Sequence, residues 1–261
     1  MLDSFWIWPF ISGASIAFLL GLAGATLFLR SAIWQGLVVG QSAAAGGVLA
    51  SVMALPLVPV ALLFSALVSL LTRRKAKLQQ ERLLLAFLLC GALMTLLIVN
   101  IPQASVAASR WLEGDVYFIT RQDSLWLLIP IMMLAVGYST LQRVWQHSQI
   151  MPDRGCAPRL SRWRFLFEAF WQLLLIVLGC LFLGLPAALF LILLPAWIAA
   201  FVANGFKPFL LLSSLISLVL FVISWAVALD LDQPFSPILI LLGSSFALLI
   251  YLLKPFFMTK K

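Results

Sequence analysis

Nine long apolar runs divide this chain, and they constrain its fold more than any other feature of the sequence. Each run approaches the ~20 residues with which a helix crosses a hydrocarbon layer of roughly 30 Å. The runs are apolar on every face, whereas the strands of a membrane barrel alternate apolar and polar residues, so helices are predicted. The predicted spans cover residues 10–29, 36–54, 57–72, 83–100, 124–141, 165–183, 186–203, 209–229 and 237–253. We therefore expect an all-α polytopic membrane protein of about nine transmembrane helices, with residues 1–261 forming one transmembrane domain.

Lysine and arginine are distributed very unevenly between the two sets of loops that these spans create. Of the 17 basic residues, 15 fall on one side, and only Arg110 and Arg121 fall on the other. Loops that stay in the cytoplasm retain positive charge, so the basic side is predicted to be the inside. This places the N-terminus outside and the C-terminus inside, which agrees with an odd number of spans. The same topology explains the net charge of +8, and nucleic-acid binding is not expected.

The residues that enzymes use for catalysis are scarce in this chain. It contains one histidine, His147, and no Ser/His/Asp or Cys/His set can be assembled within the predicted spans. No glycine-rich phosphate loop of the G-x-x-x-x-G-K-[ST] type occurs, so any use of ATP requires another chain. The three cysteines are dispersed and indicate neither a disulfide framework nor a metal site. Enzymatic activity is therefore not expected.

Two loops are longer than the others, at 23 residues each. The outer loop, Ile101–Asp123, is predicted to hold a short interfacial helix. Trp111 and Tyr117 in this loop suit the lipid headgroup layer, where amphipathic rings are enriched. The inner loop, Gln142–Arg164, carries two prolines and a glycine among basic residues, so it is predicted to be a structured turn with at most short helical pieces.

The second predicted span contains the polar residue that bears most directly on function. Between Gly36 and Gly47 it has several pairs of small residues four positions apart, a spacing that lets helices approach closely. Gln41 would be costly against lipid, so we expect it to face the bundle or a water path. Leu37 lies four residues earlier on the same helical face. A packing helix with one interhelical hydrogen bond and a pore-lining helix both fit this pattern. Three other polar residues near span ends are expected to be interfacial: Asn100, Gln172 and Asn204.

Four segments, in order along the chain, resemble the motifs of one family. They are Arg30–Gly46, Leu112–Asp123, Leu191–Ala199 and Asp232–Pro237. The second segment contains Gly114 and Asp115, and the last contains Asp232 and Pro234; both lie on the predicted outer side. On these motifs, nearly the whole chain resembles the integral-membrane permeases of ATP-binding-cassette (ABC) importers for zinc, manganese and iron.

The resemblance implies a translocation path along the second span. In the family, an aspartate and a histidine of this span are associated with the metal path. Their positions here hold Leu37 and Gln41, preceded by Gly36. Leu37 cannot bind a metal ion, and Gln41 offers only a neutral carbonyl oxygen. The resemblance therefore implies a path at these three residues and assigns no set of metal ligands to the chain.

The resemblance also implies partners. The family's segment between the fifth and sixth spans docks into an ATP-binding subunit; here it corresponds to about 141–164, with Asp153, Arg154 and Gly155 near its end. ATP would be used by that subunit, and this chain is expected to bind no cofactor itself. A periplasmic or surface substrate-binding protein would dock outside, and two permease copies would form the pathway. The expected location is the cytoplasmic (inner) membrane of a bacterium, and the expected substrate is a divalent metal ion.

Alternatives remain open on the sequence alone. A secondary transporter normally has paired ionisable residues or broken helices near the membrane midplane, and the predicted spans show neither. The loss of both family ligand positions, at Leu37 and Gln41, also fits a permease homologue for a non-metal substrate or a membrane subunit that does not transport.

Overall fold

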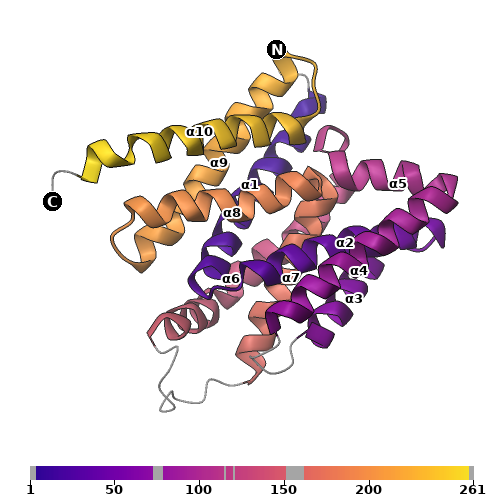
Figure 1. Ribbon diagram of the computed structural model, residues 1–261, viewed down its shortest axis with the longest axis horizontal. Coiled ribbons are helices and arrows are strands. Elements are labelled where there is room, and N and C mark those ends of the chain that lie inside the picture. Colours follow the sequence, from indigo (N-terminus) through magenta and orange to yellow (C-terminus); the bar gives the residue numbers. More distant parts are fainter. Residues whose placement is uncertain (1–3, 73–78, 115, 120, 151–161, 259–261) are drawn as a thin grey trace.

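The computed structural model describes residues 4–72, 79–114, 116–119, 121–150 and 162–258, and all regular structure within them is helical (Figure 1). The elements are α1 (Ser4–Leu29), α2 (Ile33–Val52), α3 (Leu57–Thr72), α4 (Gln79–Asn100), α5 (Pro102–Glu113), the short 3-10 helix η2 (Val116–Phe118), α6 (Arg121–Ile150), α7 (Arg162–Leu183), α8 (Leu185–Val202), α9 (Phe206–Asp230) and α10 (Phe235–Met258). The prediction of an all-α chain is confirmed.

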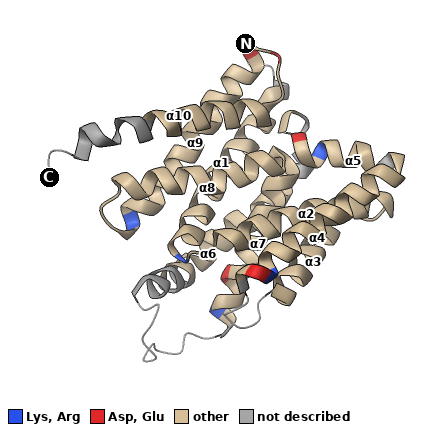
Figure 2. Cartoon of the chain, in the orientation of Figure 1, with Lys and Arg blue, Asp and Glu red and all other residues tan. Residues whose placement is uncertain are grey.

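Each predicted span corresponds to one helix, although α1 begins six residues earlier and α6 ends nine residues later than predicted, and α5 is the short extra helix expected in the outer loop. Among the described residues, six helices are long and apolar enough to cross a membrane. Three shorter apolar segments, in α3, α6 and α10, match the remaining predicted spans. The chain is thus a multi-pass membrane protein, while the count of nine spans and their orientation stay predictions. Most charged residues of the described helices lie at or near helix ends (Figure 2), as spans require, whereas Glu168 lies two turns inside α7.

Helix α1 lies in the middle of the bundle, with α2 to α5 gathered on one side of it and α8 to α10 on the other (Figure 1). It packs most extensively against α9, and two buried serines join the two helices. Ser213 donates its hydroxyl to the carbonyl oxygen of Gly21 at 2.8 Å, and Ser217 donates to that of Ala17 at 2.6 Å. Serine hydroxyls often join helices by such hydrogen bonds in apolar surroundings, because a hydroxyl without a partner there would be an unsatisfied polar group.

Helix α2 is the second centre of packing, in contact with α3, α4, α5, α7 and α8. Its small residues face several neighbours, not one. A Cβ added at Gly46 would meet Phe64 Cβ at 2.8 Å and Ala61 Cα at 3.3 Å, so α2 and α3 approach closely there. At Gly40 the space is filled instead by Leu189, on α8. Most of the small residues therefore provide recesses for large side chains from different helices.

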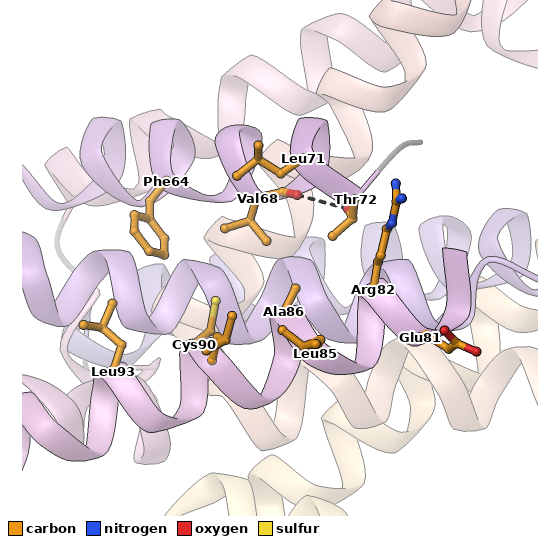
Figure 3. A pocket seen from close by; sticks show the side chains of 11 residues that line it. Phe64, Val68, Leu71, Thr72, Glu81, Arg82, Leu85, Ala86, Cys90 and Leu93 are labelled. Atoms are coloured by element: carbon orange, nitrogen blue, oxygen red, sulfur yellow. Dashed lines mark hydrogen bonds between the residues drawn. The ribbon is translucent and has the colours of Figure 1, made fainter. Parts of the chain in front are cut away.

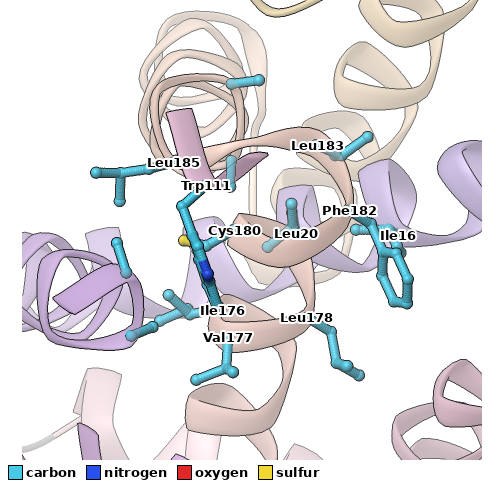
Figure 4. Packing of buried hydrophobic residues seen from close by; sticks show 14 of the residues in the cluster. Ile16, Leu20, Trp111, Ile176, Val177, Leu178, Cys180, Phe182, Leu183 and Leu185 are labelled. Carbon is cyan, nitrogen blue, oxygen red and sulfur yellow. The ribbon is translucent and has the colours of Figure 1, made fainter. Parts of the chain in front are cut away.

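The predicted placement of Trp111 in the headgroup layer is wrong. This side chain is only 1 % exposed and lies in the main apolar core, near Ile176, Cys180 and Leu185 (Figure 4). The reason is the amphipathic pattern of α5: Ala104, Ala107, Ala108 and Trp111 are buried on one face. The small residues of that face bring α5 close to α2, and the indole fills the space over Gly47.

The inner loop is shorter than predicted. The expected turn began at Gln142, but α6 continues as a helix to Ile150, and α7 begins at Arg162. The stretch from Leu141 to Ile150 contains no proline or glycine, so nothing in it stops a helix that has left the apolar layer. The helical part of the predicted coupling segment is therefore longer than the sequence pattern indicated.

Candidate functional site

The outer motif around Gly114 is held by a crossing of two backbones. Gly114 ends α5 with φ +81°, and Gly184 separates α7 from α8 with φ +89°. A Cβ at Gly114 would lie 2.5 Å from the backbone nitrogen of Gly184, and a Cβ at Gly184 would lie 2.7 Å from the carbonyl oxygen of Leu112. Both the backbone conformation and the lack of space require glycine at these two positions. The outer helix is thus pinned to the turn between two spans.

An aromatic cluster connects this motif to the second outer motif. The Tyr117 ring of η2 lies 5.0 Å from the Trp225 ring of α9 and 6.0 Å from the Trp6 ring of α1. Trp225 in turn lies 6.3 Å from Phe235, the first residue of α10. The hydroxyl of Tyr117 is buried without a hydrogen-bond partner among the described residues, and burial raises the pKa of Tyr117 to about 12. The two outer motifs therefore form one packed surface.

Asp232 and Pro234 shape the turn between α9 and α10. Asp232 has φ +55°, and the next backbone N–H, that of Gln233, bonds to the Ala228 carbonyl at 3.0 Å. Helix α9 thus ends with a residue in the left-handed backbone conformation, which aspartate tolerates better than most residues. Both side chains are exposed. Asp115, the remaining predicted residue of the outer motifs, lies outside the described part of the chain.

The predicted path residues lie on α2 but do not all share one face. Gln41 is half-buried, and its Nε2 is 3.4 Å from the position that a Cβ at Gly91 of α4 would take. Leu37 is half-buried one turn earlier, on the same face of the helix. Gly36 is buried, and a Cβ there would meet Leu27 of α1 at 3.0 Å. Leu37 and Gln41 thus belong to the side of α2 that packs on α4, whereas Gly36 packs on α1.

A buried polar network, which sequence interpretation missed, lies at the opposite end of the bundle. Arg30, just after α1, pairs with Glu168 of α7 at 2.6 Å, and the Glu168 side chain is only 1 % exposed. Gln172 donates to Thr26 Oγ1 at 2.9 Å and to Glu168 Oε1 at 3.3 Å. Gln172 is therefore a core residue and not the interfacial group that was predicted. The sequence signal that could have indicated this network was the spacing of Glu168 and Gln172, two polar residues four positions apart at the start of one apolar run.

Breaking this ion pair from one side should destabilise the protein. We expect Glu168→Gln to lower the unfolding free energy by about 1–3 kcal/mol, below the roughly 3–5 kcal/mol of a fully buried pair, because Arg30 is 21 % exposed. Arg30→Gln should have a similar effect, and the double variant should lose less than the two single losses combined. Thermal unfolding of the purified chain in mild detergent measures all three, with exposed Glu81→Gln as the control. Strictly additive losses would show that the pair contributes nothing.

The described residues contain no group of three or more His, Cys, Asp or Glu side chains that could hold a metal ion. The predicted coupling residues, Asp153, Arg154 and Gly155, lie outside the part of the chain that the structure describes. The two helices that flank them are described, and α7 leads from Arg162 directly to the buried Glu168.

No family model and no curated protein sequence matches the chain. Solved structures do match it. A chain of PsaBC from Streptococcus pneumoniae, solved in complex with Fab, is similar at a TM-score of 0.76 with 16% sequence identity, over 95% of this chain and 91% of that chain. A transporter described as of the metal-chelate ABC type, in an inward-facing conformation, is similar at a TM-score of 0.74 with 17% identity, over 94% and 85% of the two chains. The chain therefore has the fold of metal-type ABC importer permeases, the family that its motifs resemble.

Proposed function

We propose that this chain is the membrane-spanning permease subunit of an ABC importer. The observation that supports this proposal most directly is the likeness to the two transporter structures, which covers 85% or more of every chain compared. Permease subunits of ABC transporters are not catalytic, since ATP is hydrolysed by a separate subunit. In this proposal the chain supplies the path and the coupling surface, and a partner supplies the chemistry.

The proposed partners lie on the two sides of the membrane. An ATP-binding subunit would contact the segment between α6 and α7, where Asp153, Arg154 and Gly155 lie in the sequence. A substrate-binding protein would dock on the outer surface that contains Gly114, the Tyr117 cluster and the exposed turn at Asp232. Two permease copies would enclose the path. The proposed location is a bacterial cytoplasmic membrane.

Purification of a tagged chain from its source membranes tests the assembly. In a mild detergent, we expect an ATP-binding subunit to copurify with the chain, and the reconstituted complex to take up substrate into proteoliposomes only when ATP is supplied. A chain that purifies without any ATP-binding subunit, and whose proteoliposomes ignore ATP, would contradict the proposal.

The proposed substrate is a divalent metal ion that passes the side of α2 carrying Leu37 and Gln41. An imidazole binds zinc in preference to manganese. A neutral amide discriminates less between these two ions. We therefore expect Gln41→His to raise the ratio of zinc to manganese uptake several-fold in proteoliposomes that contain the whole complex. Iron uptake is measured in parallel.

A matched control separates the path from the rest of the surface. Asn204 is exposed at the turn between α8 and α9, so Asn204→His adds the same imidazole away from α2. This variant should leave the uptake ratio unchanged. Equal ratios in the wild-type and Gln41→His complexes would remove Gln41 from the metal path, while ATP-dependent uptake itself would still identify the importer.

A further inference from the structure

A groove between α3 and α4 lies apart from the residues assigned above. Both helices pack against α2, but they contact each other only slightly and leave a cavity of about 540 Å³ between them. Its walls are apolar along most of their length, with Phe64, Val68 and Leu71 on α3 and Leu85 and Leu93 on α4 (Figure 3). Leu89 of α4 lines the groove as well. Leu71, Leu85 and Leu89 are each more than half exposed, so the groove opens away from the bundle. In a membrane, that opening is accessible to lipid wherever no second copy of the chain covers it.

One end of the groove is polar, and its lining includes one acidic and one basic residue, Glu81 and Arg82. Arg82 extends from α4 toward the end of α3, near Thr72, whereas the Glu81 carboxylate points away from it (Figure 3). The Thr72 hydroxyl donates to the Val68 carbonyl of its own helix at 3.0 Å. Arg82 is half-buried and forms no ion pair or hydrogen bond within the described part of the chain. A half-buried guanidinium at the mouth of an apolar groove, with no counter-ion among the described residues, is suited to an anionic partner.

One further feature favours an anion at this end. Helix α4 begins at Gln79, and the partial positive charge of a helix N-terminus attracts negative groups.

We propose that an anionic phospholipid binds here, with one acyl chain between α3 and α4 and its phosphate at Arg82. The apolar walls match the acyl chain, and the Arg82 guanidinium, which has no ion-pair partner among the described residues, matches the phosphate. Basic pockets between helices on the cytoplasmic side of membrane proteins recognise such headgroups. The proposal depends on the membrane location of the chain but not on the substrate that it transports.

Native mass spectrometry of the full chain in mild detergent tests the proposal. Dioleoylphosphatidylglycerol and dioleoylphosphatidylcholine are added separately, and the bound lipids are counted. We expect Arg82→Gln to weaken phosphatidylglycerol binding about fivefold, since one basic residue near a headgroup contributes roughly that factor. Binding of phosphatidylcholine should not change. Arg82→Lys should retain most of the affinity, and this variant shows that the effect comes from the charge.

Two other variants examine the groove itself. Ala86→Phe places a ring among the lining residues and should weaken binding of both lipids, with thermal unfolding as the check that the chain still folds. Lys207→Gln removes an exposed charge at the start of α9, on the same predicted side, and should leave binding unchanged. Equal effects of Arg82→Gln and Lys207→Gln would overturn the proposal. A Leu89→Cys chain that cross-links to a second copy in phosphatidylglycerol vesicles would also overturn it, because another helix would then cover the groove.

Discussion

Gly114→Ala is expected to destabilise the protein by about 3–5 kcal/mol, because it combines backbone strain with an overlap of two main chains. The alanine would have to adopt φ +81°, and its Cβ would lie 2.5 Å from the Gly184 nitrogen. Backbone atoms, unlike the tips of side chains, cannot move aside cheaply. Thermal unfolding of the purified chain in detergent measures the loss, which should be on the order of 10 °C in melting temperature.

Gly205→Ala is the matched control for this variant. Gly205 also has a positive φ, +116°, but the nearest atom to an added Cβ is Pro208 Cδ at 3.8 Å. Gly205→Ala introduces backbone strain but no overlap of the added Cβ with another main chain. The unfolding free energy should therefore fall by only about 1–3 kcal/mol. If the two alanine variants unfold at the same temperature, the crossing of α5 and the α7–α8 turn does not contribute to stability.

The second large effect is expected where Trp111 packs on α2. Trp111→Ala should cost about 3–5 kcal/mol, because it removes a fully buried indole from the main core. Gly47→Ala should be destabilising as well, since the added Cβ would overlap the Trp111 ring. A smaller residue at position 111 would remove that overlap. The loss of unfolding free energy in the double variant Gly47→Ala/Trp111→Leu should therefore be smaller than the sum of the two single losses.

Gly36→Ala serves as the control on the same helix. There the added Cβ meets only the end of the flexible Leu27 side chain, at 3.0 Å, so the loss should be under about 1 kcal/mol. Additive losses for Gly47→Ala and Trp111→Leu would contradict the packing that the structure shows between α2 and α5.

The positions of the helices could be predicted because a membrane span is a local property of the sequence. A run such as 209–229 has the composition of a span whatever its neighbours are, and α9 forms there. The ends of the helices were less predictable, since α6 continues for nine residues beyond the predicted boundary at Leu141. Nothing in the apolar pattern marks where a polar helix outside the membrane stops.

Contacts between distant segments could not be predicted in this way. A tryptophan beside a charged residue, as in Arg110-Trp111, looks the same whether it lies at the lipid headgroups or packs in the core. Its burial depends on Gly47, 64 positions earlier in the sequence. Likewise, Gln172 was expected at the interface because it lies near a span end, whereas its partners in the network include Thr26 of α1 and, through Glu168, Arg30 just after α1. One-dimensional patterns do not contain that proximity.

The site was predictable only in part for the same reason. The shared face of Leu37 and Gln41 follows from helical geometry, and it is the face that packs on α4. Gly36 was grouped with them through its place in the motif, yet it faces Leu27. Asp232 was expected from the resemblance to belong to an outer motif, and its left-handed φ gives that position a second, conformational role.

The backbone crossing at Gly114 has a mechanical consequence. Helix α7 runs without interruption from Arg162 to Leu183, next to the crossing, and at 1.5 Å per residue its 22 residues extend about 33 Å. A force on α5 therefore acts on the Leu183 end of α7. The Arg162 end of the same helix adjoins the segment proposed to contact the ATP-binding subunit. Helix α7 can transmit a displacement between the two surfaces as a lever does, with no intervening loop to absorb it.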